Sequence, residues 1–192
     1  MLFRSDFKEI LPARSLSELE KIIMDISDGE DVLEIFALEN KNQMVFKVAN
    51  TEFSTRVIEG EFPDYTQIMP KGKNTGFSVL KSEFSTAVKI ASIFARNVIG
   101  NKARFSIDPE AKILELKASV IDLGNNESKV SISKGFGDKV ETAYNIKFLQ
   151  EMLNAMKGEE ILYETEGITS PGVFRDKDDA AFVHIIMPMR LE

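Results

Sequence analysis

The chain has 192 residues, of which 43% are hydrophobic, and a formal net charge of −7. This composition can supply a folded core and excludes wholesale disorder, while the excess of acidic residues argues against a protein that holds nucleic acid through a broad basic surface. The absence of cysteine excludes disulfides, thiolate catalysis and thiolate metal sites, and it fits a cytoplasmic protein.

The first predicted repeat opens with a short strand at residues 8–13 and continues into a helix over residues 15–26. Ser15, followed by Glu18, predicts a capping box at the start of this helix. Three strands are expected after it, and one apolar stripe at helical spacing marks its buried face: Leu16, Leu19, Ile22, Ile23 and Ile26. The strands are predicted at residues 32–38, 43–49 and 51–58.

The second repeat is predicted to open with a strand at residues 77–80 and to enter its helix near Ser82. The helix shows the same apolar spacing, in Phe84, Ala87, Ile90, Ala91 and Phe94. Strands are expected at residues 104–108, 112–121 and 128–134, joined by turns at 108–111 and 124–126. Residues 134–138 contain too few glycines for a phosphate loop and are interpreted as a turn.

The third repeat is predicted to open near Val140, with a helix over residues 145–156 that ends at Gly158. The apolar stripe recurs in Ile146, Leu149, Met152, Leu153 and Met156. Strands are expected at residues 160–165, 171–175 and 181–187. The plan of one strand, one helix and three strands is therefore used three times.

Such repeats predict an α+β fold with helices on one face of mainly antiparallel sheets. A unit with one apolar face should share its core with another unit, so three units make one and a half domains. Because the stretches around Pro63 and Pro70 separate the first repeat from the others, we expect an incomplete domain at residues 1–65 and a complete one at 66–192. The odd number of repeats suggests the C-terminal piece of a longer protein.

Groups suited to catalysis are scarce. The single histidine, His184, lies in an alternating strand without a candidate nucleophile beside it, and the acidic run at residues 176–179 lacks the ligand spacing of a calcium loop. We therefore expect no enzyme, no cofactor and no metal site, and a hydrolase that uses surface carboxylates is the least favoured alternative. No apolar run approaches the ~18 residues of a membrane helix, and residues 1–6 are too short and mixed for a signal peptide.

Two stretches are more specific than the periodicity. They are Gly60-Glu61-Phe62-Pro63-Asp64-Tyr65, between the first two repeats, and Met187-Pro188-Met189-Arg190-Leu191, which only Glu192 follows. Together they resemble the bacterial sliding clamp family, the beta subunit of DNA polymerase III. The resemblance implies a clamp-like fold, with residues 1–65 as the second half of the middle domain and residues 66–192 as the C-terminal domain. For full-length relatives it implies a head-to-tail homodimer that encircles duplex DNA and tethers the polymerase.

The resemblance also implies an apolar groove for short peptides from polymerases and clamp loaders. Its residues would be Pro63, Gln67, Ile68, Asn145, Phe148, Ser170, Pro171, Gly172, Ile185, Met187, Pro188, Met189 and Arg190. From the residues alone, the same apolar side chains would be interpreted as filling a domain edge. Gln67 replaces an Arg of some relatives, and the other wall of the groove belongs to the absent half-domain, so we expect a weakened site.

In the family, helices line the DNA channel, which implies DNA-facing roles for Lys89, Arg96, Lys147 and Lys157. Lys89 and Arg96 share a predicted exposed stripe with Ser85 and Ser92, and Lys147 and Lys157 share one with Gln150 and Asn154. Ordinary solvated helix faces would look the same. The alternative function is a protein-interaction module of the same fold without a DNA role. We further expect residues 1–60 to self-associate through their uncovered apolar surface.

Overall fold

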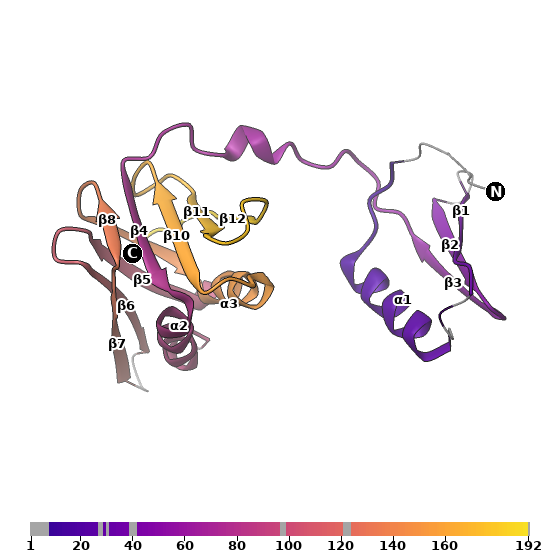
Figure 1. The fold of residues 1–192 in the computed structure, drawn as a ribbon, viewed down its shortest axis with the longest axis horizontal. Helices are drawn as coiled ribbons and strands as arrows, with labels where there is room; N and C mark the ends of the chain where they lie inside the picture. Colours follow the sequence, from indigo (N-terminus) through magenta and orange to yellow (C-terminus); the bar gives the residue numbers. More distant parts are fainter. Residues whose placement is uncertain are drawn as a thin grey trace. The chain divides into compact units, whose positions relative to one another are not determined.

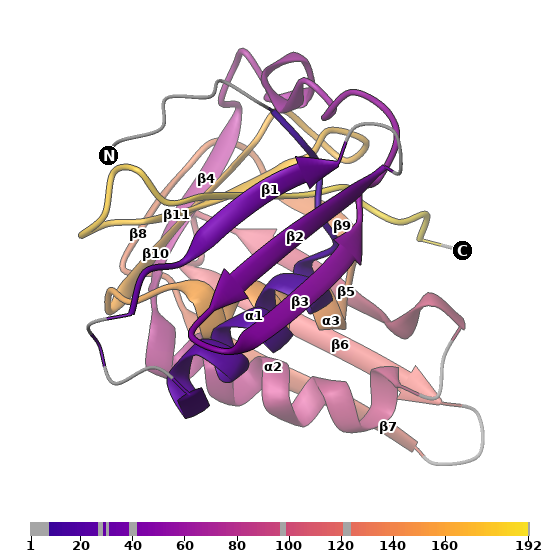
Figure 2. The ribbon, with the colours of Figure 1, turned by 90° about the vertical axis from the view of Figure 1, so that its right-hand side faces the viewer.

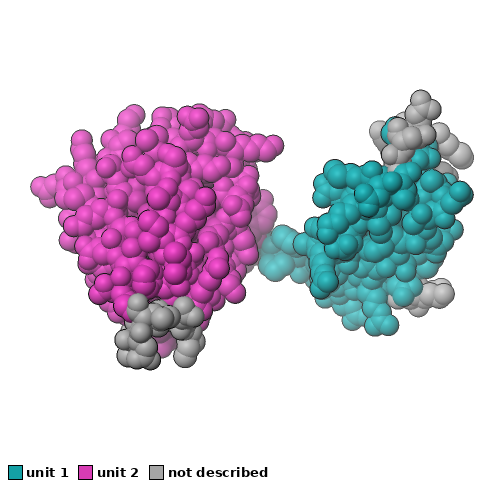
Figure 3. All heavy atoms as spheres, turned by 90° about the horizontal axis from the view of Figure 1, so that it is seen from below, with its two compact units in different colours: residues 1–64 teal, residues 65–192 magenta. Residues whose placement is uncertain are grey.

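The computed structural model describes residues 8–26, 29, 31–38, 42–96, 99–120 and 124–191, without the side chains of Ile99 and Val120. It divides into two compact units, Met1–Asp64 and Tyr65–Glu192 (Figure 3). No helix among the described residues is long and apolar enough to cross a membrane.

The first unit is one helix on a three-stranded sheet (Figure 2). Helix α1 (Ala13–Ile26) crosses one face of the antiparallel sheet β1-β2-β3, formed by β1 (Glu34–Leu38), β2 (Gln43–Val48) and β3 (Thr51–Arg56). Leu19, Met44 and Phe46 form its buried core. An antiparallel bridge between Ile10 and Ile58 brings the opening segment to the end of the unit.

The predicted capping box at Ser15 is wrong. Helix α1 begins two residues earlier, because the Pro12 carbonyl already accepts the Ser15 N–H at 2.9 Å. The Ser15 hydroxyl instead meets that of Thr55 on β3, 2.8 Å away, and Glu18 pairs with Lys21 at 3.1 Å. The Ser15 hydroxyl thus helps to hold α1 on the sheet.

The second unit carries two repeats on two sheets (Figure 1). The first repeat contains β4 (Thr75–Leu80), α2 (Lys81–Ala95), β5 (Lys102–Asp108), β6 (Ile113–Val120), β7 (Gly124–Ser131) and β8 (Lys134–Phe136). The second contains β9 (Val140–Asn145), α3 (Ile146–Ala155), β10 (Glu160–Thr165), β11 (Gly172–Asp176) and β12 (Val183–Ile186). Short 3-10 turns lie at η2 (Tyr65–Ile68) and η3 (Ile99–Asn101).

The two repeats of this unit exchange their opening strands. The sheet orders are β12-β11-β10-β4-β8 and β7-β6-β5-β9, so β4 joins the strands of the second repeat and β9 joins those of the first. All pairings are antiparallel, and α2 and α3 pack side by side (Figure 1). The predicted α+β architecture is confirmed.

Helices α2 and α3 run in opposite directions. The start of α2 lies at the end of α3, because the Lys81 N–H donates to the Glu159 carbonyl at 2.8 Å and its ammonium donates to the Met156 carbonyl. At the other end, Lys102, which opens β5 after α2 and η3, pairs with Asn145, directly before α3. The repeats are thus related as by a twofold axis.

Two turn predictions in the second unit are wrong. Residues 134–136 form β8, which pairs with β4 in the register Gly76 to Phe136, and not a simple turn. Residues 124–126, predicted as a hairpin turn, are the beginning of β7. In both places a long-range partner provides backbone hydrogen bonds that local turn propensity cannot anticipate.

Candidate functional site

The segment after β12 is fixed along β9. The Met189 N–H donates to the Ala143 carbonyl at 2.7 Å, and the Lys102 ammonium donates to the Arg190 carbonyl at 3.2 Å. Arg104 contacts the Leu191 carbonyl in the same way. Because its backbone is tied to two strands, this C-terminal segment presents its side chains from a fixed position.

A pair of buried tyrosines supports the loop before β11. The Tyr144 and Tyr163 hydroxyls lie 2.7 Å apart, and burial raises the pKa of Tyr163 to about 12 and that of Tyr144 well above its usual value. Both rings touch the space above the Gly172 Cα, where an added Cβ would lie 2.8 Å from Tyr163 Cε2. Only a glycine lets the loop approach the tyrosines this closely.

Asn145 joins β9 to α3. Its side chain accepts the Lys147 N–H at 2.9 Å and caps the helix, with Phe148 following three residues later. The capped first turn therefore fixes where Phe148 emerges. Phe148 is 48% exposed, unusual for a large apolar side chain.

The structure brings most of the predicted groove residues of the second unit around Tyr144. Asn145 follows it, Gly172 lies against it, and Met189 bonds to Ala143 before it. Ile185 pairs with Val173, so Met187 and Pro188 leave the sheet next to the loop of Ser170 and Pro171. Met187 is 56% exposed, whereas Ile185, Pro188 and Met189 are partly buried.

The remaining predicted groove residues lie elsewhere in the chain. Gln67 and Ile68 are exposed on η2, ahead of the Asn74 N–H, which donates to the Thr165 carbonyl at 3.0 Å and ties this stretch to β10. Pro63 is exposed and belongs to the first unit. Arg190 is exposed beyond Met189.

His184 lies opposite Phe174 in the β11–β12 pair and is partly buried. Burial lowers the pKa of its imidazole, and the nearby Glu151 carboxylate opposes that shift. The neutral ring is therefore favoured at neutral pH. Among the described residues, no cluster of three His, Asp or Glu side chains could hold a metal ion.

Four predicted DNA-facing cations lie on the helices of the second unit or directly after them. Lys89, Arg96, Lys147 and Lys157 are all exposed, and α2 and α3 pack together. The predicted exposed stripe on α2 is partly wrong, since Ser92 is buried and its hydroxyl donates to the Lys89 carbonyl at 2.7 Å. No local sequence pattern indicates the role of Lys81, whose ammonium joins the start of α2 to the end of α3.

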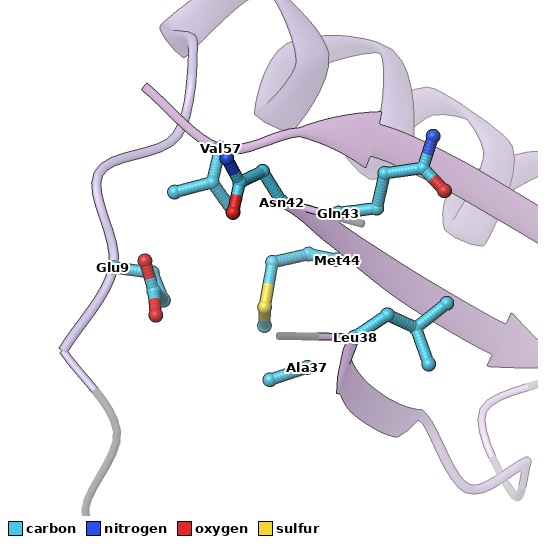
Figure 4. Close-up of a pocket in the computed structure, with 7 residues that line it drawn as sticks. All are labelled: Glu9, Ala37, Leu38, Asn42, Gln43, Met44 and Val57. Carbon is cyan, nitrogen blue, oxygen red and sulfur yellow. The ribbon is translucent and has the colours of Figure 1, made fainter. Parts of the chain in front are cut away.

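One described pocket lies in the first unit, between the opening segment and the sheet (Figure 4). Its volume is about 40 Å³, an order of magnitude below the ~300–1,000 Å³ typical of small-molecule sites. Met44 points into it from β2, with Ala37 and Val57 beside it, as Figure 4 shows. It can hold a water molecule and is no substrate site.

Comparison with known proteins relates the whole chain to one family. Residues 66–190 match the family model described as DNA polymerase III beta subunit, C-terminal domain. A beta sliding clamp from Staphylococcus aureus (strain Mu50) is 30% identical over 181 residues, covering 94% of this chain and 46% of the relative. The chain thus spans about half the length of the curated relatives it matches.

Solved structures give the same relationship at the level of fold. The crystal structure of a DNA polymerase sliding clamp from Bacillus subtilis superposes with a TM-score of 0.79 at 27% identity, over 97% of this chain and 47% of that one. A DNA polymerase III beta chain from Streptococcus pneumoniae gives a TM-score of 0.82 at 21% identity, over 98% and 48% of the two chains.

Proposed function

Because the chain belongs to the DNA polymerase III beta subunit family, we propose that it provides the C-terminal part of a sliding clamp, a processivity factor that tethers a DNA polymerase to duplex DNA without catalysing a reaction itself. Residues 66–192 would be the C-terminal domain and residues 1–65 the second half of the domain before it. The division of the chain between Asp64 and Tyr65 supports this assignment. Whole clamps of this kind would close head to tail around DNA.

The second unit would receive partner peptides in the apolar groove around Tyr144. The observation that carries this proposal is that Met187 and Phe148 are exposed although their backbone is held in place. The hydrogen bond from Met189 to Ala143 fixes the backbone near Met187, and the Asn145 cap fixes the helical turn that carries Phe148. Methionine adapts to different apolar side chains, and Pro188 restricts the backbone dihedral angles of this side of the groove. A short peptide bearing Leu or Phe would bury its side chains there.

A titration with a fluorescent clamp-binding peptide tests the groove. Met187→Ala should weaken binding roughly 5- to 30-fold, since removing a buried methionine contact at a binding surface costs about 1–2 kcal/mol. Met24→Ala is the matched control, because Met24 is also an exposed methionine, at 73% against 56% for Met187, but lies on α1. Equal affinity for wild type and Met187→Ala would discard the groove.

The same titration measures what Pro63 and Gln67 contribute. If residues 63–67 form part of the groove, Pro63→Ala weakens binding, and Gln67→Arg strengthens it by adding a cation beside the apolar wall. If neither variant changes the affinity, the groove consists of residues 145–190 without this stretch.

The exposed cations of α2 and α3 would face DNA phosphates. The overall charge of −7 limits such contact to a local surface, which suits a ring that slides without reading bases. In a clamp completed with the preceding domains, the charge reversals Lys89→Glu and Lys147→Glu should shorten retention on circular duplex DNA, whereas Lys71→Glu, outside the helices, should not. Retention on linear DNA as long as on circular DNA would contradict a topological clamp and favour the interaction module.

A further inference from the structure

The segment that leads from η2 into β4 is tied to the end of β10. Just ahead of β4, the Asn74 N–H donates to the Thr165 carbonyl at 3.0 Å, and the Asn74 side-chain amide donates to the Glu166 carbonyl at 2.9 Å. The Lys73 ammonium pairs with the Glu164 carboxylate at 2.6 Å. The attachment between the two strands thus continues past the sheet, toward η2.

Glu166 makes the contact nearest to η2. Its carboxylate accepts the N–H of Gly72. An added Cβ on Gly72 would lie 3.0 Å from Glu166 Oε1, so the carboxylate directly contacts the Gly72 backbone. Hydrogen bonds to a carboxylate are roughly twice as strong as those between neutral groups. Both residues are partly buried, which makes this bond a suitable anchor for the segment.

The same residue begins the loop of the proposed groove. After Glu166, the Gly167 N–H donates to the Thr165 hydroxyl at 3.2 Å, and the Gly167 carbonyl accepts the Ser170 N–H at 3.1 Å. These bonds define the turn that leads from Glu166 to Ser170 and Pro171. Glu166 therefore lies where the incoming segment and the groove loop meet.

Ile68 lies close to this anchor along the chain. It is 50% exposed at the end of η2 and precedes Gly72 by four residues, so the two Cα atoms are within about 14 Å of each other. The intervening Met69 and Pro70 are partly buried, so this connection packs against the protein. An anchor at Gly72 therefore limits the positions that Ile68 can occupy.

The sheet itself does not need this anchor. Strand β4 is held to β10 by six residue pairs, from Glu160 with Leu80 to Thr165 with Thr75, and its other edge pairs with β8. Loss of the bond between Glu166 and Gly72 should therefore change the position of the preceding segment much more than the stability of the fold.

We propose that Glu166 is a positioning residue of the peptide groove. Its carboxylate holds Ile68 beside the loop of Ser170 and Pro171, so that both contact one bound peptide. Holding the binding segments in place before the peptide arrives reduces the entropic cost of binding. The inference rests on the proposed function, because it assigns a role within that groove.

Titration with the fluorescent peptide tests this role in variants of Glu166. Glu166→Ala should weaken binding roughly 3- to 10-fold, because the segment of Ile68 must then be ordered when the peptide binds. Glu166→Gln should bind like the wild type, since its amide oxygen can still accept the Gly72 N–H. Glu159→Ala is the matched control, because Glu159 is exposed just before the opposite end of β10.

A double-mutant cycle separates positioning from a direct contact or a general loss of structure. If Glu166 acts through Ile68, Glu166→Ala should add nothing to the loss of affinity that Ile68→Ala causes. Amide hydrogen exchange gives a readout without peptide. Exchange at Gly72 should be slow in the wild type and in Glu166→Gln, and fast in Glu166→Ala.

Four results would each overturn the proposal: wild-type affinity in Glu166→Ala, equal losses in Glu166→Ala and Glu166→Gln, additive losses in the double variant, or fast exchange at Gly72 in the wild type. Met187→Ala distinguishes this failure from a failure of the groove. If Met187→Ala weakens binding and Glu166→Ala does not, the groove stands without this anchor. If neither weakens binding, both proposals are wrong.

Discussion

At Asp176, a single carboxylate holds two parts of the second unit together. It is buried at the end of β11 and accepts the Gly158 N–H at 2.7 Å and the Asp178 N–H at 2.9 Å. Asp176→Ala would leave these donors without their acceptor and should lower the free energy of unfolding by about 1–3 kcal/mol in denaturant titrations. Asp178→Ala, at an exposed neighbouring position, is the control and should change it little.

The same carboxylate predicts a pH dependence. The backbone hydrogen bond from Gly158 is the main cause that lowers the pKa of Asp176 below its ordinary value of 3.8. Its ionised form therefore stabilises the fold fully above about pH 3.8, and this contribution is lost as the pH falls through the lower folded-state pKa. The stability difference between wild type and Asp176→Asn should be constant near neutral pH and shrink below pH 3.8, and a difference independent of pH would contradict this role.

Gly172 illustrates a position at which a side chain has no space. Gly172→Ala would press a methyl group against Tyr144 and Tyr163, whose rings belong to the core. Such overpacking typically costs about 1–3 kcal/mol, so unfolding should occur at lower denaturant concentration and the shifted loop should weaken peptide binding. Thr169→Ala, at an exposed position of the same loop outside the proposed groove, should do neither.

Among the elements, α3 has an N-terminal cap that should affect both the stability of the fold and the position of Phe148 in the proposed groove. Asn145→Ala removes the acceptor of the Lys147 N–H and should cost about 1 kcal/mol, whereas Asn145→Ser keeps a capping oxygen and should cost much less. If Asn145 also contacts the peptide directly, both variants weaken binding by similar factors. If Asn145 acts only by fixing the position of Phe148, Asn145→Ala weakens binding in step with its loss of stability, and Asn145→Ser restores both.

The elements also show which features the sequence alone could reveal. Periodicity identified α1, α2 and α3 within about two residues at each end, because a buried helical face needs a repeating apolar stripe. It missed β8, whose short pairing with β4 depends on Gly76 lying against the Phe136 ring, a contact between distant residues. In the candidate site, the grouping around Tyr144 arises in the same way, from pairings such as Gly172 with Ile186 that no local pattern encodes.

At the scale of the whole molecule, the two units should differ in stability. The first buries only Leu19, Met44 and Phe46 in its core cluster, whereas the second packs two helices against sheets with exchanged strands and contains a group of packed aromatic rings. A core this small provides little hydrophobic free energy to offset the loss of chain entropy. Thermal unfolding should therefore show two transitions, the lower one belonging to residues 8–58.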